Sequence, residues 1–260
     1  MKALLTFVLA ALMLGARADA QAPTATATNA ALRYWMAFAL MKDPPADQAT
    51  MELLDRVASG ASPWDEARLG KFVDDNRDSL QIMRRATKLA SCDWGLEYEL
   101  GSNTPIAHLA KARVLGRLNG ADAARLAARG QTDAAIDAWL AGIRFSQHVA
   151  KGGTLISLLS AKLSLSPALK SLARVLSQSR VDAARRKEIE VTLNGIPPAG
   201  LDWADAMKRE AELVAARKRL DPKLNAEMPV QSRVNQTSAE VSAEILAVRA
   251  SLASAAQRGR

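Results

Sequence analysis

The chain has 260 residues, one cysteine and a formal net charge of +8. The single cysteine excludes an intramolecular disulfide framework, so packing must stabilise the fold, and the length suits one large domain or two small ones. Aromatic residues make up only 4% of the chain. Valine and isoleucine recur at helical rather than alternating spacings, which argues against a β-fold.

The first twenty residues have the pattern of a secretory signal peptide. Lys2 supplies a positive charge, Ala3–Gly15 form an apolar run of thirteen residues, and Ala18-Asp19-Ala20 is an A-x-A cleavage site. The apolar run is shorter than the roughly 20 residues of a transmembrane helix. We therefore expect cleavage after Ala20 and a soluble protein exported to the periplasm or the medium. The alternative is an uncleaved membrane anchor.

Residues 21–28 are mainly alanine, threonine and proline without periodicity, which predicts a flexible leader. From Asn29, which can serve as an N-cap, the pattern becomes helical. The apolar residues of this helix that share one face are Leu32, Trp35, Met36, Ala39 and Leu40. Asp43-Pro44-Pro45 predicts its end, because proline cannot continue a helix. A second helix is predicted over Asp47–Ala58.

Ser62-Pro63 predicts the start of the next helix, with serine as the cap and proline at the first helical position. The helical pattern then covers Trp64–Leu89, with a potential break near Asn76. It is followed by Ser91–Gly95, which we expect to be irregular.

A long helix is predicted from Pro105, capped by Asn103 or Thr104, to about Arg129. Asn119-Gly120 lies within it and is a potential kink, because glycine costs about 1 kcal/mol relative to alanine in a helix. After Gly130 a further helix is predicted over Thr132–Ala150.

The helix predicted over Thr154–Ser177 is the richest in leucine and is expected at the centre of the core. More polar helices follow over Asp182–Asn194 and Trp203–Leu220. The last helix spans about Arg233–Gln257, and its narrow apolar stripe consists of Val234, Val241, Ile245, Val248 and Leu252. Such a stripe packs either on the chain's own core or on a second copy, which would make a homo-oligomer.

Gly130–Ile136, followed by Gly142, resembles the turn and second helix of a tetratricopeptide repeat. In that family small residues let two helices approach closely, and Ala123 stands at a compatible position in the preceding helix. The match covers about residues 115–148, occurs once and lacks the family's aromatic positions. The resemblance implies an antiparallel helix pair.

These elements predict an all-α fold of stacked antiparallel helix hairpins, forming a helical bundle or a short tetratricopeptide-like array. Residues 29–180 are predicted to form the main helical domain. Residues 181–260 are predicted to form C-terminal helices that pack on it or mediate association.

A wider pattern resembles an uncharacterised family of exported, all-helical bacterial proteins. The residues that carry this resemblance are Asn29-Ala30-Ala31, Tyr34-Trp35, Ala37, Cys92-Asp93-Trp94-Gly95, Gly142, Arg144, His148 and Thr154-Leu155-Ile156-Ser157. The resemblance implies a helical fold and an exported location. It implies no chemistry.

The positive charge is concentrated in the middle third of the chain. Residues 104–180 carry 11 Lys/Arg against 3 Asp/Glu, whereas residues 21–103 carry 9 against 12 and residues 181–260 carry 13 against 11. A basic surface attracts polyanions, but export and the lack of a nucleic-acid-binding motif argue against nucleic acid. The remaining partners are anionic lipid headgroups, an anionic wall polymer or an acidic protein. The alternative is a solvated face with no dedicated ligand.

One cluster of reactive residues follows from the predicted helix pair. If the helices on either side of Gly130 are antiparallel, His108 and His148 lie at the same end, offset by about 6 Å along the axis. Cys92 and Asp93 enter from that end. A thiolate, a carboxylate and two imidazoles could bind zinc or support nucleophilic catalysis. The alternative is a buried, unreactive cysteine and histidines hydrogen-bonded to backbone.

Two functional hypotheses follow. The first is an exported, non-catalytic binding or scaffold protein whose protein partner the sequence does not identify. The second is a hydrolytic or metal-dependent enzyme that uses Cys92, Asp93, His108 and His148. No cofactor is predicted, and zinc is the only candidate metal.

Overall fold

The computed structural model describes residues 28–220 and 231–258, and within them the chain is all-α, with ten α-helices, one short 3₁₀ helix and no strand. The predicted all-α class is therefore confirmed. The elements are α3 (Ala30–Leu40), α4 (Gln48–Ala58), α5 (Glu66–Asp75), α6 (Arg77–Ala86), η1 (Tyr98–Asn103), α7 (His108–Ala128), α8 (Thr132–Ala150), α9 (Leu155–Gln178), α10 (Ala183–Asn194), α11 (Trp203–Leu220) and α12 (Gln231–Arg258). The predicted signal peptide, and the leader apart from Thr28, lie outside the described residues.

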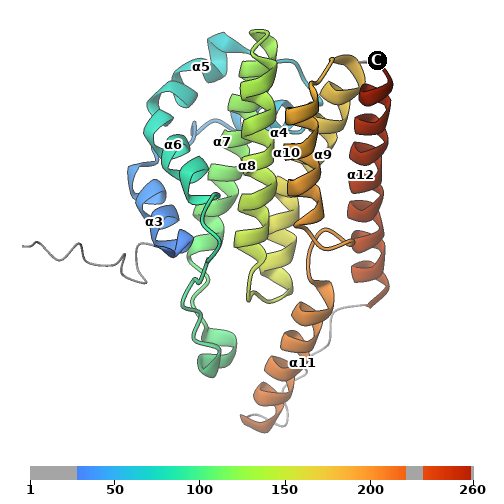
Figure 1. Ribbon diagram of the computed structural model, residues 1–260. Helices are drawn as coiled ribbons and strands as arrows, with labels where there is room; N and C mark the ends of the chain where they lie inside the picture. Colours follow the sequence, from blue (N-terminus) through green and yellow to red (C-terminus); the bar gives the residue numbers. More distant parts are fainter. Residues whose placement is uncertain (1–27, 221–230, 259–260) are drawn as a thin grey trace, which may run out of the picture.

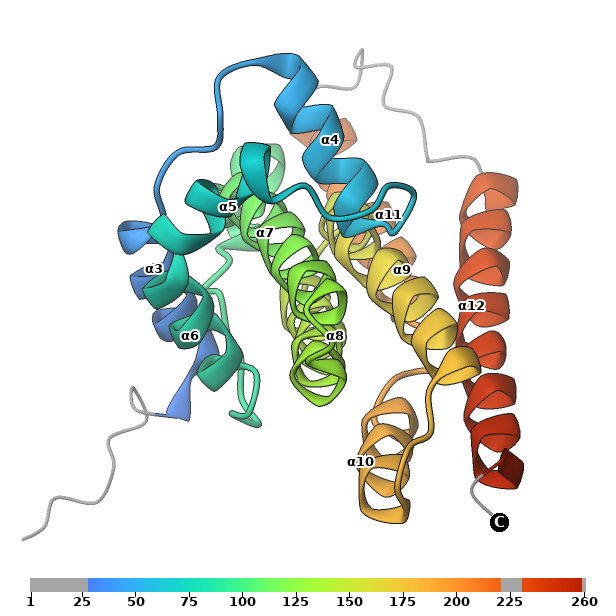
Figure 2. The same ribbon diagram turned by 90° about the horizontal axis from the view of Figure 1, so that it is seen from above.

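Helices α7, α8 and α9 form the centre of the bundle (Figures 1 and 2). On one side α3 packs against α6, and α4 and α5 pack against α7. On the opposite side α12 packs along α9, with α10 between α12 and α8. Helix α11 extends from the lower end of the bundle in Figure 1, where it contacts η1. Among the described helices, none is long and apolar enough to cross a membrane.

The α7–α8 pair is the antiparallel hairpin that the tetratricopeptide resemblance implies. Gly130 turns the chain with a φ of +72°, a backbone conformation that glycine adopts readily. Ala123 and Ala135 are completely buried between the helices. A Cβ atom on Gly142 would lie 3.1 Å from Asn119 Nδ2, so the two helices approach as closely as these small residues allow.

Helix α7 continues through Asn119-Gly120, so the chain does not break there. The Asn119 amide Nδ2 donates a hydrogen bond to the Ala138 carbonyl at 2.9 Å, which ties α7 to α8. Gly120 faces α4, where an added Cβ would lie 3.1 Å from the Cβ of Ala58. Both residues therefore take part in the packing of α7 against its neighbours.

Two predicted helix starts are wrong. Helix α5 begins after Asp65, whose carboxylate accepts a hydrogen bond from the Arg68 backbone N–H, and not at Ser62-Pro63. Helix α7 begins at His108 rather than at Pro105, and η1 precedes it. In both places proline lies before the helix. The predicted break at Asn76 is confirmed, since α5 ends and α6 begins there.

The apolar residues predicted to share one face of α3 do so, but this face is turned to solvent. The exposed fractions are 40% for Leu32, 42% for Trp35, 49% for Met36 and 49% for Leu40, and Ala39 is also exposed. The buried face consists of Ala30, Ala31, Tyr34, Ala37 and Phe38. Three alanines, Tyr34 and Phe38 thus form the inner face, which packs against α6, and Leu32, Trp35, Met36 and Leu40 remain outside.

The apolar stripe of α12 packs within the chain. Val234, Val241, Ile245, Val248 and Leu252 are all buried, and α12 runs along α9. This stripe is therefore not left for a second copy. Helix α9 is only partly central, because Leu158, Leu165 and Leu172 are buried whereas Leu159 and Leu163 are exposed.

Candidate functional site

Three of the four predicted site residues lie around Trp94. The Trp94 indole Nε1 donates a hydrogen bond to the His148 carbonyl at 2.7 Å. Its ring stacks on His108, with ring centroids 4.3 Å apart. The Cys92 thiol also points to the His148 carbonyl, at 3.8 Å. Cys92, His108 and His148 therefore meet at a tryptophan, which His108 contacts from α7 and His148 from α8.

Asp93 does not join this cluster. Its side chain is exposed, and its Oδ1 accepts a hydrogen bond from the Gly95 N–H at 2.9 Å, which shapes the loop. The Asp93 backbone N–H and carbonyl bond to the Asn29 side chain, so the loop is fixed to the start of α3. Within residues 28–220 and 231–258, no group of three or more His, Cys, Asp and Glu side chains is arranged to hold a metal ion.

Burial shifts the pKa of each ionisable group in the cluster away from its usual value. Desolvation raises the pKa of Cys92 to about 12, so the thiol stays protonated, and the thiolate is the nucleophilic form. Desolvation lowers the pKa of His108 to about 4, and desolvation together with Lys151 lowers that of His148 to about 4. Both imidazoles are therefore neutral at pH 7. This arrangement lacks the activated nucleophile that a cysteine enzyme needs.

Tyr34 belongs to the cluster and was missed by the sequence reasoning. Its hydroxyl is hydrogen-bonded to His148 Nδ1 at 2.7 Å, and its ring packs edge-on against Phe145 with centroids 4.9 Å apart. The side chain is completely buried. The sequence feature that could have identified Tyr34 is its helical spacing from Ala31 and Ala37, which puts it on the face of α3 opposite Leu32 and Met36.

The buried histidines predict acid sensitivity. Their pKa values are about 4 in the folded chain and 6.5 when exposed, so below pH 6.5 only the unfolded chain takes up these protons. The free energy of unfolding should then fall as the pH drops from 6.5 to 4, by about 1.4 kcal/mol per pH unit for each histidine. Urea denaturation at several pH values measures this slope. His148→Gln should remove about half of it, and a flat profile in the wild type would contradict the burial of both imidazoles.

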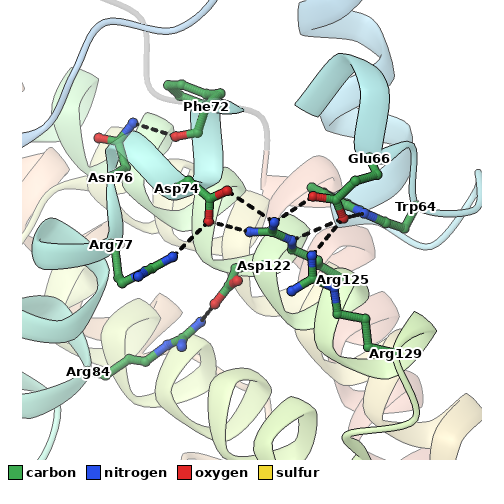
Figure 3. Close-up of polar contacts among 10 residues, drawn as sticks. All are labelled: Trp64, Glu66, Phe72, Asp74, Asn76, Arg77, Arg84, Asp122, Arg125 and Arg129. Atoms are coloured by element: carbon green, nitrogen blue, oxygen red, sulfur yellow. Dashed lines mark hydrogen bonds and ion pairs between the residues drawn. The ribbon is translucent and has the colours of Figure 1, made fainter. Parts of the chain in front are cut away.

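A second feature is a groove of about 580 Å³ between α6 and α7. Six cationic and three anionic side chains line it. The cationic residues are Arg77, Arg84, Arg85, Lys88, Arg125 and Arg129, and the anionic residues are Asp74, Asp78 and Asp122. Most of their polar contacts are drawn in Figure 3. The lining therefore has an excess of positive charge.

Arg125 forms one wall of the groove and is 7% exposed. Its guanidinium donates to Glu66 at 2.5 Å and to Asp74 at 2.8 Å, and Figure 3 shows it between the two carboxylates. It also lies 5.6 Å from the centre of the Trp64 ring. Hydrogen bonding to Arg125 and then to Arg77 lowers the pKa of Asp74 to about 2. This network attaches α5 to α7 and fixes the shape of the groove.

The cations differ in how strongly they are held. Arg84 donates to Asp122 at 2.6 Å and to Asn119 at 2.9 Å, with its side chain only 28% exposed. Arg85 and Lys88 are exposed, and neither forms an ion pair with any residue in the described part of the chain. The groove thus has fixed arginines inside and free cations along its rim.

This groove does not follow from the regional distribution of charge. The excess charge lies in residues 104–180, but four of the six cations of the groove come from α6 and the turn after it. The opposing charges of residues 21–103 hid them in the regional count. Comparison of the chain with protein-family models, with curated proteins and with solved structures gives no match in any of the three cases.

Proposed function

We propose that this chain is an exported, non-catalytic binding protein, and that the groove between α6 and α7 binds an anionic ligand. The observation that carries this proposal is the cationic lining, in which Arg84 and Arg125 are held in place by internal partners while Arg85 and Lys88 have none. Held arginines bind an anion with little loss of side-chain freedom, because their rotamers are already fixed.

A ligand with repeated phosphate groups, such as an anionic wall polymer, suits a groove with cations inside and along its rim. Arginine and lysine are the usual phosphate-binding side chains, and several of them act together on a chain of charges. Export of the chain, which the N-terminal pattern predicts, would place the protein beside such polymers. The protonated thiol of Cys92 and the outward side chain of Asp93 favour a binding role over catalysis at the Trp94 cluster.

Reversing the two free charges tests the proposal. Inorganic polyphosphate is the probe, and its affinity is measured by isothermal titration calorimetry at low salt. Arg85→Glu with Lys88→Glu should weaken binding by about tenfold or more, because two attractive charges become repulsive. Both side chains are exposed and free of described ion pairs, so the fold should be unchanged.

The matched control is Arg56→Glu with Lys187→Glu. Both positions are exposed, lie on α4 and α10 outside the groove, and undergo the same change in net charge. This variant should keep most of the affinity. Equal loss in the two variants would show that polyphosphate responds to net charge alone, and the groove would then not be the binding site.

A further inference from the structure

We propose that α3 docks on an anionic lipid surface through its exposed apolar face, here called the α3 stripe and defined as Leu32, Trp35, Met36, Ala39 and Leu40. The side chains would enter the boundary between headgroups and acyl chains, as those of interfacial helices do. This surface is separate from the groove, and the proposal goes beyond ligand binding there.

The first support is the apolar area that α3 presents. Four large apolar side chains, each 40–49% exposed, recur at helical spacing on a helix of only 11 residues. Contiguous exposed apolar surface of this kind marks an interaction site. Trp35 is the aromatic member, and tryptophan is the residue most typical of membrane–water interfaces.

The second support is that α3 is held firmly from behind. Tyr34 and Phe38, on its inner face, stack against Trp94 with centroid distances of 5.7 and 6.3 Å. Trp35 packs edge-on against Trp94 at 6.4 Å. The stripe is thus presented by a fixed helix at the outer edge of the molecule, as Figures 1 and 2 show for α3.

The third support is charge. Residues 29–42 contain Arg33 and Lys42 but no aspartate or glutamate, and Asp43, which follows them, is paired with Lys111 at 3.7 Å. Both cations are exposed, and neither has an ion pair within the described residues. An apolar stripe bordered by cations complements an anionic bilayer surface.

The same charges argue against a second copy as the occupant. Two α3 stripes packed together would place the cations Arg33 and Lys42 of both copies in one interface, while the adjacent acid Asp43 is already paired with Lys111. The apolar run Ala3–Gly15 precedes α3 in the sequence, and its proposed role in export would bring α3 to a membrane.

An environment-sensitive fluorophore tests where α3 lies. Leu40→Cys in the full chain gives one reactive thiol, because Cys92 is buried and its pKa is raised to about 12. With vesicles containing phosphatidylglycerol, the emission of a nitrobenzoxadiazole probe at position 40 should increase and shift to the blue. Vesicles of phosphatidylcholine alone should have a much smaller effect. The control is Leu246→Cys on α12, which is 65% exposed on the opposite side and should not respond.

A partition measurement gives the second readout. Leu32→Ser with Met36→Ser should lower the vesicle partition coefficient of the full chain by about tenfold or more, because apolar contact with the acyl boundary is lost. Val191→Ser with Leu246→Ser removes comparably exposed apolar side chains elsewhere and should leave partitioning unchanged. Equal binding of the two variants would overturn the proposal. So would a probe at position 40 that responds to protein concentration without vesicles, which would identify a second copy.

Discussion

Replacing Trp94 with alanine is expected to lower the free energy of unfolding by about 3–5 kcal/mol. Trp94 is 9% exposed, stacks on His108 and Phe38, and donates a hydrogen bond to the His148 carbonyl. Its removal would leave a cavity between α3, the start of α7 and the end of α8. Urea denaturation followed by far-ultraviolet circular dichroism measures the change.

Two further variants separate the contributions at this position. Trp94→Phe keeps a stacked ring but loses the indole N–H, so the loss should be about 1–2 kcal/mol. Trp35→Ala removes a ring that is 42% exposed and should cost less than Trp94→Ala. If Trp35→Ala destabilised the chain as much as Trp94→Ala, the placement of Trp94 as the centre of the cluster would be wrong.

Replacing Arg125 with alanine is expected to lower the free energy of unfolding by about 2–3 kcal/mol. The guanidinium bonds to Glu66 and Asp74 of α5, and its aliphatic stem is buried, so both the ion pairs and the packing are lost. The effect should shrink as the pH falls towards 2, because Asp74, whose pKa is about 2, then becomes protonated in the wild type. Chemical denaturation of wild type and variant at neutral and acidic pH measures both effects.

Arg129→Ala is the matched control on the same helix end. Within the described residues the Arg129 side chain pairs with Glu66 and no other acid, and it is half exposed, so solvent screens its ion pair and its loss should be much smaller. A similar loss in the two variants would indicate a general effect of charge near Glu66. The difference between them isolates the buried, bidentate position of Arg125, which attaches α5 to α7.

The sequence determined the helical class and several helix bounds. The predicted ranges Thr132–Ala150 and Trp203–Leu220 coincide with α8 and α11, and the break at Asn76 is present. Caps, glycine turns and apolar periodicity are local signals, so they act between residues close in the chain. Where proline preceded a helix by several residues, as at Ser62-Pro63, the local signal indicated the wrong start.

The meeting of Cys92, His108 and His148 could be predicted only in outline. The antiparallel helix pair predicted about Gly130 places both histidines at one end, and α7 and α8 form this pair in the structure. Three details depended on side-chain packing among distant segments. Trp94 contacts both histidines, Asp93 is exposed and bonds to Gly95, and Tyr34 is hydrogen-bonded to His148. The pKa shifts followed from that burial, and no sequence pattern reports burial directly.

Tertiary structure alone decided which faces are buried. The apolar residues Leu32, Trp35, Met36 and Leu40 share one face of α3 by periodicity, but the face that packs against the rest of the chain is the one with Tyr34, Phe38 and the alanines. The stripe of α12 was compatible with either a second copy or this chain, and α9 covers it. The groove likewise combines residues of α6 and α7 that are far apart in sequence. Periodicity shows that a helix has an apolar face. Contacts between distant segments decide whether a neighbouring helix covers that face or whether it stays exposed.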